Sequence, residues 1–311
     1  MGALVNPAVA GILLGVGLRL IVRLQLPSSL VTALTILALG LLGTKSGLIV
    51  AEDRAGVSSV LMVCSLVAIA SAVVARAAFG RMARLGPADS GALAVHYASV
   101  SVAAYPLLTA YLERVGFAVT GHIASTFVVL EVLGLLAGLT VASLSSASVR
   151  QWNMALRQSL VGREIIALTL SFGVSAGIGQ LVSDDASNLI GQAFGGLLPI
   201  YMVTVGMTLG TRLGDLRLVA GRLVGTTIAV SLMSAVVAAT VARLASWSIA
   251  ETAALLVMAA SASYVAAPGI VRRAIPDASP TISLTCAVAI TFPLNVIFGI
   301  PGFVAIARWM G

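Results

Sequence analysis

Two segments of the chain combine an acidic residue, two serines and a proline with the same spacing. Residues 89–106 read DSGALAVHYASVSVAAYP and residues 251–268 read ETAALLVMAASASYVAAP, and they align without a gap at an offset of 162 residues. Each segment contains a Ser-x-Ser pair, which is Ser99 and Ser101 in the first and Ser261 and Ser263 in the second. Hydroxyl groups both donate and accept hydrogen bonds, so four of them close together suit the recognition of a small anion.

The prolines predict that both segments are interrupted helices. Pro106 and Pro268 each lack a backbone N–H and disfavour helix at the preceding residue. In a hydrophobic span, the freed backbone groups are tolerated only against protein or a water-filled cavity. The half-helix that follows a break presents N–H groups to an anion, and the half that ends there presents carbonyl groups to a cation. Paired breaks therefore predict a transporter binding site, while the alternative is that the small serines only let helices pack closely.

Further candidates for ion chemistry lie in other hydrophobic segments. Glu131 lies near the centre of the segment FVVLEVLGLLAG, where a carboxylate is costly; it could bind a cation, relay a proton or cap a neighbouring broken helix. Residues 291–295 read TFPLN, in which Pro293 is expected to break the helix and Thr291 and Asn295 supply neutral oxygens for a hard cation. Asn6 precedes the first span and is expected to cap it.

The elements that position these residues are membrane spans. Hydrophobic residues make up 59% of the 311 and charged residues only 9%, which is far from the composition of a soluble domain and predicts an all-α polytopic membrane protein. Runs long enough to cross a bilayer fall near residues 4–22, 30–50, 57–80, 88–112, 121–143, 163–182, 190–211, 219–245, 251–273 and 280–306. The first run has the features of a true span rather than of a removable signal peptide. The sequence therefore predicts ten transmembrane helices, of which the fourth and ninth are broken.

The basic residues predict the orientation of the chain. With the N-terminus outside, 13 of the 18 Lys and Arg residues fall in loops on the cytoplasmic side. They are Arg19, Arg23, Arg76, Arg81, Arg84, Arg150, Arg157, Arg163, Arg212, Arg217, Arg222, Arg272 and Arg273. Both termini are therefore expected outside a cell membrane. The net charge of +7 is spread over short loops that face an anionic leaflet, so nucleic acid is not an expected partner.

The repeat extends beyond the broken helices. GLLGTKSG at residues 40–47 corresponds to GMTLGTRLG at 206–214, and VVARAA corresponds to TVARLA with Arg76 and Arg243 in register. Five spans repeat, and because five is odd the second copy enters the membrane from the opposite side. The chain is therefore predicted to hold two inverted repeats, 1–143 and 163–311, joined by a cytoplasmic linker at 144–162.

The remaining candidate residues favour no other chemistry. His96 has no counterpart in the second repeat, so a packing role or a simple hydrogen bond is favoured over a proton relay, and His122 is expected at a membrane interface. Cys64 and Cys286 lie in apolar runs without metal-ligand spacing and are interpreted as packing residues. Enzymatic motifs are absent, and no enzyme activity, organic cofactor or metal centre is expected.

Several strings together resemble the sodium-dependent bicarbonate transporter family. They are ASASYVAAP (260–268), HYASVSVAAY (96–105), AITFPLNVIFGIP (289–301) and LALGLLGTKSG (37–47), and the resemblance covers nearly the whole chain. It implies a ten-span fold with inverted repeats, a core domain around crossing spans four and nine, a gate domain that mediates trimer formation, and elevator-type movement. Each domain draws on both repeats.

The same resemblance implies the ligands and their residues. The implied bicarbonate pocket lies at the two breaks and is formed by the four Ser-x-Ser serines with backbone N–H groups; Tyr97 and Tyr264, in the same strings, join the substrate-binding candidates. Sodium, as the coupling ion, would be bound by Glu131, Thr291, Asn295 and Asn6. Photosynthetic members carry a longer cytoplasmic segment and are inhibited by a PII-type regulator, and the short linker here argues against such a partner.

The sequence departs from the family pattern and leaves alternatives open. The usual first break reads more like YGSVSAVTF, whereas here Ala98 stands in place of a glycine and residues 103–105 differ, which affects the expected pocket shape. The leading hypothesis is sodium-coupled import of bicarbonate. The main alternative is a sodium- or proton-coupled transporter of another small carboxylate, with Glu131 or His96 as the proton carrier. A membrane sensor and an anion channel rank below both transporters.

Overall fold

The protein is built from long apolar helices. The computed structural model describes residues 7–52, 57–144 and 162–311, of which 84% are helical and none forms a strand. Seven helical stretches in this part of the chain are long and apolar enough to cross a membrane. They comprise α2 (Ser28–Glu52), α3 (Val57–Arg81), α6 (Gly121–Ser143), α8 (Arg163–Ile178), α9 (Asp184–Leu213), α10 (Gly221–Leu244) and the C-terminal stretch Pro280–Met310. The prediction of a polytopic, all-α membrane protein is therefore confirmed.

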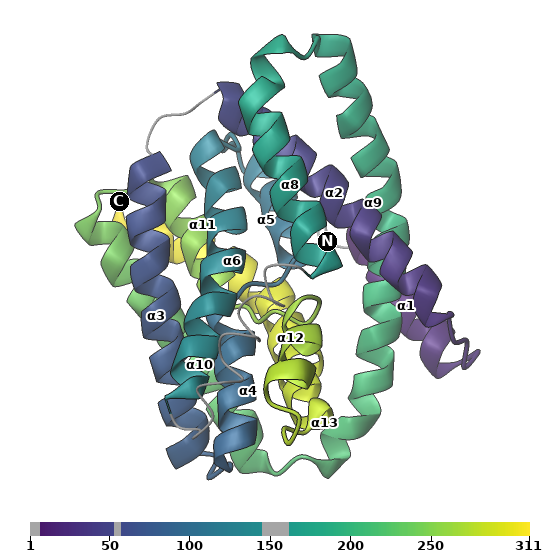
Figure 1. Ribbon diagram of the computed structural model, residues 1–311, viewed down its shortest axis with the longest axis vertical. Helices are drawn as coiled ribbons and strands as arrows, with labels where there is room; N and C mark the ends of the chain where they lie inside the picture. Colours follow the sequence, from purple (N-terminus) through teal and green to yellow (C-terminus); the bar gives the residue numbers. More distant parts are fainter. Residues whose placement is uncertain (1–6, 53–56, 145–161) are drawn as a thin grey trace.

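Four helices are joined by contacts of α1 (Pro7–Leu20) with α9, of α2 with α8 and of α2 with α9, and are called here the four-helix group. The α8 and α9 helices form a hairpin at the upper right of Figure 1, with α1 packed on α9 and α2 packed on α8. A Cβ atom at Gly15 would lie 2.1 Å from the carbonyl oxygen of Val203, and one at Gly206 would lie 2.1 Å from that of Ile12. Only glycine permits this approach of α1 and α9, which is typical of membrane helix pairs.

The other helices form a second group, called here the break-containing group. It comprises α3, α4 (Pro87–Ala98), α5 (Ala104–Arg114), α6, α10, α11 (Ile249–Ala259), α12 (Ala267–Ala274) and the C-terminal stretch. The α4 helix packs on α3 and α6, and α11 packs on α10 and α15 (Ile300–Met310). Tyr97 and Phe79 meet in the centre of this group with their ring centroids 5.2 Å apart. Figure 1 shows α3, α6 and α10 on the opposite side of the molecule from α9.

Both predicted helix breaks are present. The chain leaves helical conformation between α4 and α5, over residues 99–103, and between α11 and α12, over residues 260–266. Pro106 and Pro268 lie in the first turns of α5 and α12, where a backbone N–H has no partner within the helix. Each proline is therefore accommodated in the second half-helix, and each break precedes it.

The predicted break at Pro293 is wrong. The C-terminal stretch continues as helix through α13 (Pro280–Leu284), a π-helical segment at Thr285–Thr291, α14 (Phe292–Leu294), a second π-helical segment at Asn295–Gly299, and α15. A proline in an α-helix clashes with the carbonyl group four residues earlier and removes one hydrogen bond. The wider π-helical turns on both sides of Pro293 change the hydrogen-bond spacing there and accommodate the proline. The helix therefore continues past Pro293.

Some sequence predictions fall outside the described residues. Asn6, predicted as a helix cap and sodium ligand, is one of them, and so are residues 145–161 of the predicted linker. Arg150 and Arg157, two of the arginines predicted on the cytoplasmic side, also lie there.

Candidate functional site

The two helix breaks are in direct contact, and this contact between residues 99–103 and 260–266 is called here the crossing. The N–H of Ser101 donates to Oγ of Ser261 over 2.8 Å. The N–H of Ser263 donates to the carbonyl oxygen of His96 over 2.8 Å, and Nδ1 of His96 lies 2.6 Å from the carbonyl oxygen of Ser263. Because a carbonyl oxygen only accepts, Nδ1 of His96 carries the proton and donates it. His96 therefore makes a hydrogen bond that joins the breaks.

Glu131 reaches the crossing from α6. Its Oε2 atom accepts hydrogen bonds from Oγ of Ser99 over 2.6 Å and from the N–H of Val100 over 3.1 Å. Its Oε1 atom accepts from Oγ of Ser263 over 3.5 Å. The residue is 1% exposed, and no described Lys, Arg or His side chain lies within 4 Å of its carboxylate. The contact with Val100 is the backbone cap considered from the sequence, and the carboxylate touches both breaks.

The second serine of each pair caps the half-helix that follows it. Oγ of Ser101 accepts from the N–H of Ala104 over 3.3 Å, and Oγ of Ser263 accepts from the N–H of Ala267 over 3.4 Å. These two alanines are the first residues of α5 and α12. The first N–H groups of both half-helices, and with them the positive ends of the helix dipoles, therefore lie at the crossing.

Glycines in α6 allow Glu131 to reach the breaks. A Cβ atom at Gly134 would lie 2.1 Å from the carbonyl oxygen of Ala98, and one at Gly138 would lie 2.5 Å from Cα of Val95. The backbone of α6 therefore runs against the end of α4, which brings Glu131 within hydrogen-bond distance of Ser99. The sequence analysis missed this role, although the GLLAG pattern one turn after Glu131 carried the signal.

The other sodium candidates contact the half-helices but not the carboxylate. Oγ1 of Thr291 lies 2.6 Å from the hydroxyl of Tyr97 on α4, and Nδ2 of Asn295 donates to the carbonyl of Val257 on α11 over 2.9 Å. No hydrogen bond in the described part of the chain joins Thr291 or Asn295 to Glu131. These residues are therefore close to the broken helices but do not belong to the hydrogen-bond set of Glu131.

Tyr264 faces a cavity next to the crossing. Its ring packs edge-on against Phe292 with centroids 5.6 Å apart, and its hydroxyl lies beside the side chain of Ser101. It lines a cavity of about 180 Å³ together with Tyr201 of α9, a residue that the sequence analysis did not single out. Tyr201 is missing from the repeated motifs, so only its proximity in the folded chain identifies it.

His122 lies far from the crossing and takes a structural role. Its Nδ1 atom lies 2.5 Å from Oε1 of Glu251, and its ring packs on that of Trp247 with centroids 4.5 Å apart. Glu251 also completes a capping box with Ser248 at the start of α11. The pair fixes the beginning of α6 against the beginning of α11.

Cys64 and Cys286 are free thiols and are buried.

These observations define a polytopic helical membrane protein in which two interrupted helices meet at a buried carboxylate. The family model of the Na⁺-dependent bicarbonate transporter superfamily matches residues 7–308, nearly the whole chain, and the protein belongs to this superfamily. A search of curated proteins finds no match. The family membership indicates a sodium-dependent transporter of a small anion and not an enzyme.

Proposed function

We propose that the protein is a sodium-coupled symporter that imports bicarbonate across the cell membrane by an elevator-type alternating-access mechanism. The observation that carries the proposal is the position of Glu131: a buried carboxylate, bonded only to neutral donors among the described residues, at the point where two helix breaks meet. Membership of the Na⁺-dependent bicarbonate transporter superfamily supports both the ion and the substrate.

Sodium is proposed to bind at Glu131. Burying an unpaired carboxylate costs several kcal/mol, and a bound cation offsets this cost. Oxygen atoms of the kind that hard cations prefer surround it, since Ser99 and Ser263 each bring a hydroxyl group next to the carboxylate. Thr291, Asn295 and Asn6 remain proposed sodium ligands from the resemblance, and a second sodium near Thr291 and Tyr97 would agree with their separation from Glu131.

Bicarbonate is proposed to bind on the other side of the crossing, near Ser101, Ser261 and Tyr264. The first N–H groups of α5 and α12 and the positive ends of both dipoles favour a negative charge there. Ser99 and Ser263 donate to Glu131, so their hydroxyl protons are less available to an anion. The hydroxyl of Tyr97 is hydrogen-bonded to Thr291, so Tyr97 would stabilise the site without binding the anion through this hydroxyl.

Coupling follows from the contact of one carboxylate with both breaks. Sodium at Glu131 would cancel a negative charge close to the anion site and would hold Ser99 and Ser263 in place. Each ligand then raises the affinity for the other by the same factor, as linkage requires.

The packing of the helices supports an inverted repeat. Gly43 of α2 packs against α8, and Gly210, its counterpart in the repeat, packs on Arg19 of α1. Each second span therefore contacts the first span of the other half, as two halves at 1–143 and 163–311 joined by a linker at 144–162 would require. With α1 and the two broken helices added, the seven long helices would make up the proposed ten spans.

The proposed elevator movement would use the division of the helices into the four-helix group and the break-containing group. The four-helix group would form the stationary gate domain and hold the subunits of a trimer together. The break-containing group would form the core domain and carry the substrate across the membrane.

The proposal is tested by uptake of labelled bicarbonate into proteoliposomes with and without an inward sodium gradient. We expect uptake that requires sodium and that falls to background in the double variant Ser101→Ala, Ser263→Ala. The matched control is Ser65→Ala with Ser143→Ala, because these hydroxyls donate only to carbonyls of their own helices. Folding of each variant is checked by size-exclusion chromatography. Absence of uptake by the folded wild-type protein would exclude bicarbonate and turn the search to other small carboxylates.

A further inference from the structure

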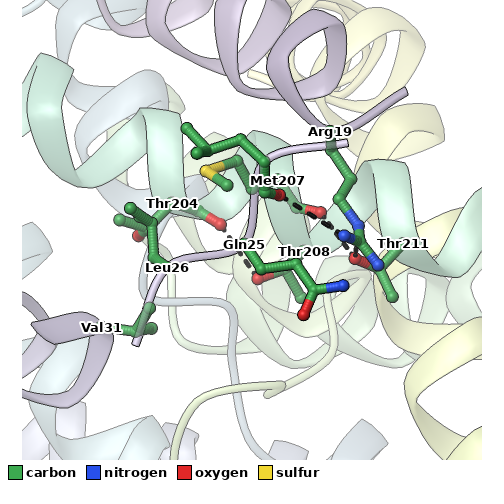
Figure 2. A pocket seen from close by; sticks show the side chains of 9 residues that line it. Arg19, Gln25, Leu26, Val31, Thr204, Met207, Thr208 and Thr211 are labelled. Carbon is green, nitrogen blue, oxygen red and sulfur yellow. Dashed lines mark hydrogen bonds between the residues drawn. The ribbon is translucent and has the colours of Figure 1, made fainter. Parts of the chain in front are cut away.

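A polar cavity lies at the end of α1, between α1 and α9. It has a volume of about 240 Å³, and its lining residues include Arg19, Gln25, Thr208 and Thr211 (Figure 2). Nε of Arg19 donates to Oγ1 of Thr211 over 2.8 Å, and Nη1 donates to the carbonyl of Leu24 over 3.4 Å. The guanidinium is thereby held at the cavity wall. Its remaining N–H groups provide further donors, since arginine carries five.

A second cavity adjoins this one and is lined in part by residues of the crossing. The cavity of about 180 Å³ next to Tyr264 shares Val31, Thr204 and Thr208 with the cavity at Arg19. The hydroxyl protons of the two threonines are donated to carbonyls of α9, so their oxygen atoms provide a polar but uncharged wall. The two cavities are neighbours along one face of α9, and we call them together the α9 passage.

The α9 passage ends at two tyrosines beside the proposed substrate site. The hydroxyl of Tyr201 is buried and has no hydrogen-bond partner among the described residues, and Tyr201 lines the cavity next to the crossing. Tyr264, which belongs to the crossing, lines the same cavity as Tyr201. A buried donor without a partner is costly, and a ligand that accepts its hydrogen bond removes this cost.

We propose that Arg19, Gln25 and Tyr201 form a subsite on the cytoplasmic side, in the α9 passage, through which a small planar oxyanion leaves the crossing. This inference rests on the proposed function, because the anion held there would be the one that is transported. A guanidinium presents parallel N–H groups that match two oxygens of a carboxylate-like anion. Arg19 attracts the anion at the mouth, and Tyr201 donates to it where the passage reaches the crossing.

The charge of Glu164 provides a second test of the proposal, because it is opposite to that of Arg19. Its side chain lines the cavity next to Tyr264, on the wall provided by α8. A carboxylate there repels an anion in the α9 passage, whereas Arg19 attracts it. The variants Glu164→Gln and Arg19→Gln are therefore expected to shift anion access in opposite directions.

The subsite is tested with an introduced cysteine. Thr208 lines both cavities, and the two native cysteines are fully buried, so Thr208→Cys provides a single reactive thiol. The purified full-length variant is treated with methanethiosulfonate reagents of similar size that carry either a negative or a positive charge. We expect the negative reagent to react faster. Adding Arg19→Gln should lower the ratio of the two rates roughly tenfold, as expected for loss of one nearby charge in water.

Two further variants make the result specific. Arg19→Lys keeps the charge and should preserve most of the ratio. Arg23→Gln removes an equal charge from an exposed residue that lines neither cavity, and it should leave the ratio unchanged. Sodium bicarbonate should slow modification of Thr208→Cys, and this protection should be lost with Arg19→Gln.

Three outcomes would overturn the subsite: equal rates with and without Arg19, preference for the positive reagent, or no reaction with either reagent. The thiol reaction does not depend on transport. A wild-type protein that selects the negative reagent but takes up no bicarbonate would therefore keep the subsite and reject the proposed substrate. A protein that takes up bicarbonate but reacts equally with both reagents would reject the subsite alone.

Discussion

At the residue scale, Glu131 can cap the broken backbone and bind a cation at the same time. The carboxylate accepts the N–H of Val100, which the break leaves without a helical partner, and it also touches hydroxyls from both broken helices. A backbone cap needs only an oxygen acceptor, and an amide would provide one. A full negative charge is costly in this environment, and its presence is explained by a cation that binds during transport.

Replacing the charge separates these roles. Glu131→Gln retains an acceptor oxygen for Ser99 or Val100 and removes the charge, so we expect the protein to fold and its sodium-dependent uptake to fall at least tenfold, which corresponds to about 1.4 kcal/mol. The measurement is bicarbonate uptake as a function of sodium concentration. Glu113→Gln, at an exposed position on α5, is the matched control.

The same variant distinguishes sodium from proton coupling. Wild-type uptake should fail when potassium or choline replaces sodium. If wild-type uptake is indifferent to that replacement while Glu131→Gln lowers it, the carboxylate carries a proton, and sodium coupling is rejected.

At the scale of elements, each broken helix is held by its cap and by close packing. The acidic residue that opens each repeated segment lies in the first turn of its helix, Asp89 in α4 and Glu251 in α11. A negative charge there stabilises the helix because it lies at the positive end of the helix dipole. The serines near the breaks cap α5 and α12. The contact of α6 with α4 then fixes the breaks against Glu131.

This close packing predicts a strong effect from a single methyl group. In Gly134→Ala the new Cβ atom would lie 2.1 Å from the carbonyl oxygen of Ala98, so α6 must move away from the first break. We expect destabilisation by about 1–3 kcal/mol and loss of transport because Glu131 is displaced. Thermal unfolding in detergent measures the first effect, and the uptake assay measures the second.

A control glycine isolates the contact from helix propensity. Gly173, inside α8, has no atom within 4 Å of an added Cβ atom, so Gly173→Ala should leave the unfolding temperature unchanged or raise it. Equal behaviour of the two variants would show that the approach of α6 to Ala98 is not needed for the site.

At the scale of the whole molecule, helix ends gather at two opposite surfaces. The connection of α8 to α9 lies at the top of Figure 1, and the connection of α9 to α10 lies at the bottom. Asp184 and Asp185 begin α9, whereas Arg212, Arg217 and Arg222 lie at or beyond its end. The charge bias of the sequence is therefore also a difference between two surfaces of the folded chain, and it favours a cytoplasmic location for the arginine-rich surface.

Single cysteines test this orientation. Asp185→Cys and Arg217→Cys place thiols at exposed positions on the two surfaces, and the native thiols are buried. With both termini outside, a membrane-impermeant thiol reagent added to intact cells should label Asp185→Cys and not Arg217→Cys. Permeabilised cells, in which both should react, are the control. The reverse pattern would place both termini in the cytoplasm and contradict the proposed orientation.

The sequence by itself determined the class of the protein, the hydrophobic segments and the two helix breaks. These features depend on local rules: a long apolar run favours a membrane span, and a proline limits the backbone of its own neighbourhood. Even so, the effect of Pro293 was predicted wrongly, because π-helical turns on either side of it can keep a helix continuous.

Only the tertiary structure decided which polar groups meet. Ser99 and Ser263 are far apart in the chain, yet both donate to Glu131, and Tyr201, which lies outside the repeated motifs, lines a cavity together with Tyr264 of the crossing. Such contacts depend on how closely helices approach one another, which is set by residues such as Gly134 that carry no chemistry themselves. The physical reason is that packing joins distant parts of the chain through shape, whereas the sequence pattern reports only on neighbouring residues.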